Sequence, residues 1–170
     1  MLSMLPSIVV LGSMALAALY IAASRRSPPE NRAERQAAAR ALVVAIVVQS
    51  VHFVEELATA LHERLPGLFD LPGMPVSVFV AFNLAWLGIW IASVPALRAA
   101  RVPAFFAAWF LAIAGMFNGI AHPLLAIAAG DYFPGLLSAP IIGGVSIWLW
   151  RRLHQATEST NRADASLENQ

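Results

Sequence analysis

Long apolar runs alternate with short polar stretches along almost the whole chain. Each run approaches the roughly 20 residues that an α-helix needs to cross the hydrocarbon core of a bilayer. The pattern therefore predicts an all-α fold, namely a polytopic membrane bundle of about five transmembrane helices. In chain order, the predicted spans are residues 1–23, 41–61, 76–96, 103–128 and 133–150.

Polar segments separate the first span from the others and close the chain. Residues 24–40 contain Pro28-Pro29 and several arginines, so we expect a water-exposed, Arg-rich loop. Residues 41–153 then form the main membrane domain, and residues 154–170 are predicted to be a disordered tail. The first span lacks a basic n-region and is followed by Arg25-Arg26, which favours a retained helix over a cleaved signal peptide.

The composition supports a membrane protein and excludes several functions. Of the 170 residues, 59% are hydrophobic and 12% are charged, which is too few charges to cover a soluble domain. The net charge of +1 offers no basic surface for nucleic acid. The absence of cysteine excludes disulfides, cysteine-ligated zinc, iron–sulfur clusters and thiol nucleophiles. The expected partners are the lipid bilayer and a lipophilic small molecule, and the oligomeric state stays open.

The arginines predict an orientation. All 11 basic residues are arginine, and every one except Arg64 falls in a segment that five spans would place on the same side. Because basic loops stay in the cytoplasm, the N-terminus is expected outside, with the Arg-rich loop and the C-terminus in the cytoplasm. The sequence thus predicts a multi-pass protein of the plasma membrane.

A small set of polar side chains interrupts the apolar spans. Such groups are costly at membrane depth and usually face a bundle interior or a cavity. With a rise of 1.5 Å per residue, all of them fall in one layer between the midplane and the outer half of the bilayer. We therefore expect one polar site built from the second, third and fourth spans, and its members are Gln49, His52, Glu55, Glu56, Asn83, Asn118 and His122.

The chemistry of this layer favours a metal or a shared proton. The spans hold no cation, so the adjacent carboxylates of Glu55 and Glu56 must be protonated, share a proton with a histidine or bind a metal ion. His52 and Glu56 are four residues apart and share a helix face, and His122 can join them from the fourth span. Two histidines and a carboxylate match the ligands of catalytic Zn²⁺ or non-haem iron.

We assign roles to the layer as follows. The metal ligands are His52, Glu56 and His122, with Glu55 and Asn118 as further candidates, and the catalytic groups are Glu55, Glu56 and His52. Gln49, Asn83 and Asn118 are supporting residues, and Asn83 is best explained by an interhelical hydrogen bond. Gly115 and Gly119 form a Gly-x-x-x-Gly pair that permits close helix contact beside Asn118.

The residues His52-Phe53-Val54-Glu55-Glu56 read H-x-x-E-E. In a small chain with several spans, this motif resembles the HXXEE domain family of integral membrane proteins. The resemblance covers residues 40–150 and implies a membrane protein with a site at the motif. It implies no particular reaction.

Three functions remain open. The first is a metal-dependent enzyme acting on a lipid-like or isoprenoid substrate, with Glu55 or a ligand water as general base. The second is metal-free acid–base chemistry on an apolar substrate, with Trp86, Trp90 and Trp109 lining the site. The third is a proton-coupled carrier or a protein that binds a small apolar ligand, without catalysis. His62, Glu63, Asp70 and His154 are expected to lie outside the site, on the surface or in the tail.

Overall fold

The computed structural model describes residues 5–158, and the regular secondary structure of this part is helical without a strand, which confirms the predicted all-α class. Residues 1–4 of the predicted first span and residues 159–170 of the predicted tail lie outside the described residues. Five long helices and one short helix follow one another in the described part. They are α1 (Leu5–Ser24), α2 (Arg32–Ala58), α3 (Leu61–Gly67), α4 (Val76–Arg98), α5 (Val102–Ala129) and α6 (Ala139–Thr157).

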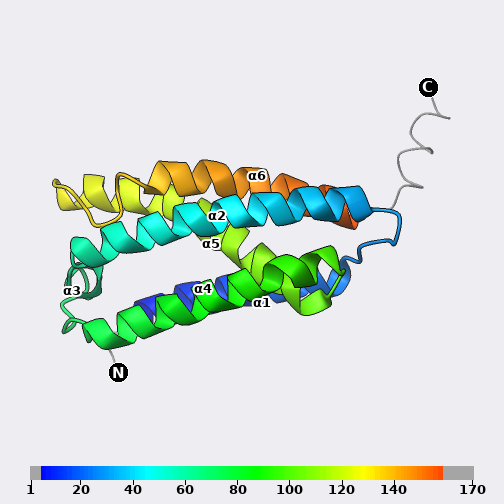
Figure 1. Ribbon diagram of the computed structural model, residues 1–170. Coiled ribbons are helices and arrows are strands. Elements are labelled where there is room, and N and C mark those ends of the chain that lie inside the picture. Colours follow the sequence, from blue (N-terminus) through cyan, green and yellow to red (C-terminus); the bar gives the residue numbers. More distant parts are fainter. Residues whose placement is uncertain (1–4, 159–170) are drawn as a thin grey trace.

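The long helices run back and forth along one common direction (Figure 1). Helix α5 packs against α6, α1 and α4, while α2 packs mainly against α6 and α4. The short helix α3 and the connection between α5 and α6 lie at the same end of the bundle (Figure 1). The C-terminus of α2, which carries the H-x-x-E-E motif, lies at this same end, because α3 follows it directly.

Glycines let α5 and α6 approach closely, as the Gly-x-x-x-Gly spacing predicts. A Cβ at Gly119 would lie 2.8 Å from the Cα of Gly143, so backbone meets backbone at this point. At Gly115 the space is taken by Ser146, whose hydroxyl oxygen would lie 2.0 Å from an added Cβ. The contact draws α6 alongside the part of α5 that carries the predicted site.

Three segment boundaries differ from the sequence prediction. The predicted loop 24–40 is helical from Arg32 onward, because the Ala-rich stretch after Pro28-Pro29 favours a helix despite its charges. The predicted fifth span, 133–150, begins as turns, since α6 starts only at Ala139. At its other end, α6 continues to Thr157, so residues 154–157 are helical and do not belong to a disordered tail.

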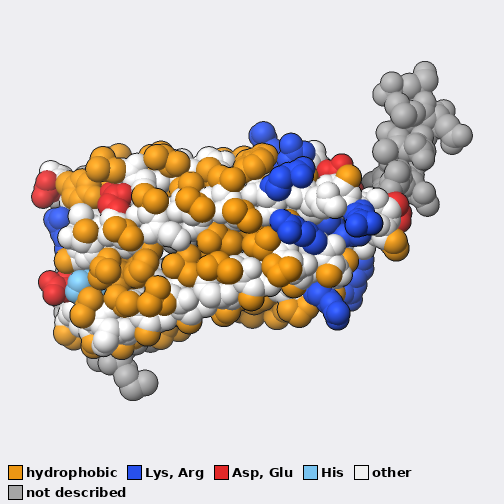
Figure 2. Space-filling model, in the orientation of Figure 1, with side chains coloured by type: hydrophobic (Ala, Val, Ile, Leu, Met, Phe, Trp, Pro, Cys, Tyr) orange, Lys and Arg blue, Asp and Glu red, His pale blue; other side chains and the backbone are white. Residues whose placement is uncertain are grey.

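Three of the described helices are long and apolar enough to cross a membrane, namely α2, α4 and α5. The apolar part of α1, Ile8–Ser24, is shorter. Large hydrophobic side chains are exposed along the molecule, and arginines gather at the end where α1 and α6 finish (Figure 2). An apolar flank with a charged end is the surface expected of a membrane helix bundle.

Candidate metal centre

Two histidines and one glutamate meet inside the bundle near the C-terminus of α2. One ligand atom each from His52, Glu56 and His122 lies within 4.8 Å of the others, and all three residues are buried. Oε1 of Glu56 is 3.2 Å from Nε2 of His52 and 3.4 Å from Nε2 of His122. His52 and Glu56 share a face of α2 because they are four residues apart, and α5 supplies His122. We call these three residues the trio.

The other ring nitrogen of each histidine has a partner outside the trio. Nδ1 of His122 is hydrogen-bonded to the carbonyl oxygen of Pro134, and a carbonyl can only accept, so this nitrogen carries a proton. Nδ1 of His52 lies 2.7 Å from Oγ of Ser138. Ser138 donates its hydroxyl proton to the Glu55 carboxylate, so its oxygen accepts the proton of His52.

These partners leave lone pairs at the centre of the trio. In a neutral imidazole, a proton on Nδ1 leaves Nε2 unprotonated. The amide nitrogen of Asn118, 3.2 Å from Nε2 of His52, agrees with this, because an amide N–H donates. The Nε2 lone pairs of His52 and His122 therefore lie beside a carboxylate oxygen in a buried place, where the Asn118 amide donates to one of them. Such a group attracts a cation, whether a metal ion or an added proton.

Glu55 does not join the trio. Its Oε1 accepts hydrogen bonds from the Tyr132 hydroxyl at 2.6 Å and the Leu137 backbone N–H at 2.9 Å. Its Oε2 accepts from the Ser138 backbone N–H at 2.8 Å and from the Ser138 hydroxyl. Both oxygens of Glu55 are therefore occupied by the segment that leads into α6, and this carboxylate is not free to act as a general base.

Residues 132–138, which we call the strap, cover the trio. A Cβ at Gly135 would lie 2.8 Å from Nδ1 of His122 and 2.9 Å from Cε1 of His52. Only glycine fits there, and its φ of +83° also favours glycine. Burial, followed by the nearby carboxylate of Glu55, raises the pKa of the Tyr132 phenol, so this hydroxyl keeps its proton and donates it. Arg64 of α3 holds the strap from outside by donating to the Tyr132 carbonyl at 3.0 Å.

The remaining predicted members of the layer lie apart from these contacts. The side-chain amide of Asn83 donates to the Phe79 carbonyl of its own helix, at 3.0 Å, so no interhelical bond to the site forms. Gln49 is buried one turn before His52. The site therefore combines the predicted second and fourth spans, α2 and α5, with the strap, and α4, the predicted third span, supplies none of the three ligands.

The predicted tryptophan lining is also absent from the trio. Trp109 packs against Trp150 and His154, which belong to the Arg-rich end of α6. Trp86 and Trp90 pack against each other, with ring centroids 5.5 Å apart. The aromatic ring beside the trio is instead Phe133 of the strap, whose centroid is 6.0 Å from that of His122.

Sequence reasoning missed the strap residues because they fell inside a predicted span. Two signals were present in the sequence. Pro134-Gly135 is a turn dipeptide, and Ser138 stands directly before Ala139-Pro140, the order of an N-cap followed by an N-terminal proline. Together they indicate a turn that ends where α6 begins.

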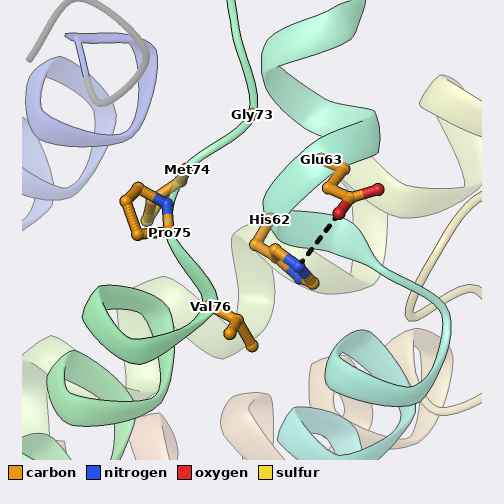
Figure 3. Close-up of a pocket in the computed structure, with 6 residues that line it drawn as sticks. All are labelled: His62, Glu63, Gly73, Met74, Pro75 and Val76. Atoms are coloured by element: carbon orange, nitrogen blue, oxygen red, sulfur yellow. Dashed lines mark ion pairs between the residues drawn. The ribbon is translucent and has the colours of Figure 1, made fainter.

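A separate shallow hollow lies between α3 and the segment before α4 (Figure 3). Its lining includes His62, whose Nε2 lies 3.6 Å from a carboxylate oxygen of Glu63. His62 was expected on the surface, yet its ring stacks on Phe79 and its side chain is 12% exposed. The hollow offers one histidine and one exposed carboxylate, which is a poorer ligand set than the trio.

No protein-family model, curated protein or solved structure matches the chain.

Proposed function

We propose that the protein is an integral membrane enzyme that binds one divalent metal ion, most suitably Zn²⁺, at His52, Glu56 and His122. One observation carries this proposal: three ligand atoms from buried residues lie within 4.8 Å of one another, and both histidines direct their Nε2 atoms toward the glutamate. The partners at Nδ1 are of the kind that orients metal-bound histidines in known sites.

The number of ligands favours a catalytic site over a structural one. Structural zinc is closed by four protein ligands, whereas catalytic zinc keeps a position for water or substrate. The trio supplies three ligands, and the nearby Asn118 directs its amide nitrogen, which is not a metal ligand, toward His52. A bound Zn²⁺ would activate water or polarise a carbonyl group. We propose a lipid-like substrate, because apolar side chains cover the outside of α2.

The H-x-x-E-E motif would then have two physical roles, metal binding and support of the strap. We propose that the chain is of the HXXEE type, in which the histidine and the second glutamate hold the metal. The i and i+4 positions, His52 and Glu56, share a helix face, while the i+3 position, Glu55, points to the strap. One helix can thus supply ligands and a support for the covering segment at once.

We further propose that α1, α2, α4, α5 and α6 all cross the plasma membrane, with the N-terminus outside. The support is the distribution of charge: Arg64 lies at the α3 end, and the other described arginines lie toward the opposite end (Figure 2). Since cytoplasmic loops are basic, the trio and strap would then lie toward the outer face.

The cysteine-free chain allows a direct topology test. Single cysteines replace two exposed residues, Leu68 at the end of α3 and Ala99 between α4 and α5. In intact cells, an impermeant maleimide should label Leu68→Cys, and it should label Ala99→Cys only after permeabilisation. The reverse pattern would invert the orientation, and labelling of both from outside would contradict five spans.

Metal content tests the site itself. Protein purified in detergent with Zn²⁺ and then desalted should retain about one equivalent, measured by elemental analysis. Glu56→Gln and His122→Gln should each lose it, because each removes one of the three ligands. His62→Gln is the matched control, since His62 lies at the same end but outside the trio. Wild-type protein that retains no metal would refute the proposal.

A continuous chain of polar contacts favours a second candidate, a metal-free proton relay. It runs from Glu56 to His52, then to Ser138, Glu55 and Tyr132. Intramembrane glutamate and histidine pairs serve as proton paths in carriers and pumps. This candidate predicts metal-free protein in which Glu56→Gln abolishes proton uptake into vesicles, and a stoichiometric metal would exclude it.

A further inference from the structure

We propose that Glu55 is a positioning residue that acts through Ser138 to hold His52 in the tautomer that a metal requires. This inference rests on the proposed metal site but concerns a residue that does not contact the metal. It separates the two glutamates of the motif into a ligand, Glu56, and a support, Glu55.

Four hydrogen-bond donors surround the carboxylate of Glu55. Each of its two oxygens receives two hydrogen bonds, so the carboxylate is saturated by donors from the strap. One of these donors is the Ser138 hydroxyl, which has a single proton to give. Because that proton is committed to Glu55, the Ser138 oxygen presents only lone pairs to Nδ1 of His52, 2.7 Å away.

The tautomer of His52 follows from this commitment. A lone pair on Ser138 stabilises the proton on Nδ1 and leaves Nε2 free to face Glu56. Without Glu55, the Ser138 hydroxyl can rotate and donate to Nδ1. The proton of the ring then favours Nε2, where it would point at Glu56 and occupy the place of a metal ion.

Substitution of Glu55 by glutamine weakens this control, most where the NH₂ group takes the place of Oε2 and the Ser138 hydroxyl loses its acceptor. An amide has one oxygen, so two of the four donors would face an NH₂ group. His122 is held differently, because its Nδ1 donates to the main-chain carbonyl of Pro134. A change confined to Ser138 should therefore alter His52 and leave His122 as it is.

Nitrogen NMR on histidine-labelled, chelator-treated protein in lipid reads the tautomers without any metal. In wild-type protein, His52 and His122 should both carry the proton on Nδ1. Ser138→Ala and Glu55→Gln should cost His52 its Nδ1–H signal, while Ser138→Thr, which keeps the hydroxyl, should retain it. Glu63→Gln is the control, since Glu63 is 70% exposed at the same end of the molecule.

Metal affinity gives the second readout. Zn²⁺ affinity should fall about 10–100-fold in Ser138→Ala and Glu55→Gln, as expected when an outer partner of a ligand is lost. Ser138→Thr should restore it, which a general loss of packing would not explain. The folded state of each variant is checked by helix content and by monodisperse elution.

The two proposals fail in different ways. If His52 keeps its Nδ1 proton in both Ser138→Ala and Glu55→Gln, the positioning role is refuted, even when wild-type protein binds metal. If the tautomers shift as expected but wild-type protein binds no metal, the metal site is refuted while the positioning of His52 by Glu55 stands.

Discussion

Buried charged groups occupy both ends of the bundle, and the two ends differ in whether these groups have complementary hydrogen-bond partners. At the Arg-rich end, Arg35 of α2 is 7% exposed. Its guanidinium donates to the carbonyls of Pro28, Pro29 and Arg98 and to the hydroxyl of Ser27. Every one of these partners accepts, so the donors of Arg35 are matched locally and the group joins α2 to a loop and to the end of α4.

At the strap end, three acceptor atoms face one another, and the Asn118 amide donates to one of them. Nε2 of His52, Nε2 of His122 and Oε1 of Glu56 converge, and their remaining contacts direct lone pairs inward. Buried polar groups that only stabilise a fold are normally paired with complementary groups. The comparison indicates that Arg35 is structural, whereas the trio is organised around a cation that the protein must obtain from outside.

The sharpest test of this contrast is the response to metal. Zn²⁺ at about 1,000 times its Kd should stabilise wild-type protein by about 4 kcal/mol, because only the folded state assembles the trio. Glu56→Gln should abolish this gain, as followed by thermal unfolding in detergent. In chelator, the same variant should be as stable as wild type or more stable, because it removes a buried carboxylate without a fixed cation. A large loss of stability in chelator would show that the trio is structural.

Arg35→Ala should have the opposite effects, namely a large loss of stability and no change in metal binding. It leaves buried carbonyls without a donor and should lower the free energy of unfolding by about 3 kcal/mol, with or without Zn²⁺. Metal content should stay at the wild-type value, since Arg35 lies at the other end of α2 from the trio. Arg35→Lys, which keeps the charge but cannot reach all four acceptors, should recover part of the loss. Loss of metal in Arg35→Ala would contradict the independence of the two ends.

The same contrast explains what the sequence could and could not reveal. The all-α class and the approach of His52, Glu56 and His122 follow from apolar run lengths, helix periodicity and depth, all of which depend on local sequence. The partners of Glu55 could not be found in this way, because Leu137 and Ser138 bind it through backbone N–H groups. Any residue type offers such a donor, so only the turn at the start of α6 places them.

Arg35 was missed for a related reason. A polar stretch next to an apolar run was interpreted as a loop, although its alanines favour a helix that continues into the run. The burial of Arg35 depends on where Pro28, Pro29 and Arg98 place their carbonyls. The first two belong to the segment before α2, and Arg98 ends α4, which packs on α2.

Gly135→Ala tests how closely the strap must cover the trio. The new methyl group would press on the rings of His52 and His122, so we expect a loss of about 2 kcal/mol in stability and faster release of bound Zn²⁺ to a chelator. Gly130→Ala is a matched control, because Gly130 also has a positive φ, +67°, but nothing lies within 4 Å of an added Cβ. Equal metal release from both variants would show that backbone strain, and not the contact with the imidazoles, explains the effect.

Tyr132→Phe should have the smallest effect, about 1 kcal/mol, since it removes one of four hydrogen bonds to Glu55 near the surface. The pKa of Tyr132 is raised in the folded protein, by burial first and by the Glu55 carboxylate next. Its contribution is therefore fully present below the ordinary tyrosine pKa of about 10 and is lost as the pH rises through the higher folded value. Thermal unfolding should thus give a higher midpoint temperature for wild type than for Tyr132→Phe at neutral pH. The difference between the two midpoints should disappear in strong alkali. A difference that grows with pH would mean that the phenol does not donate to Glu55.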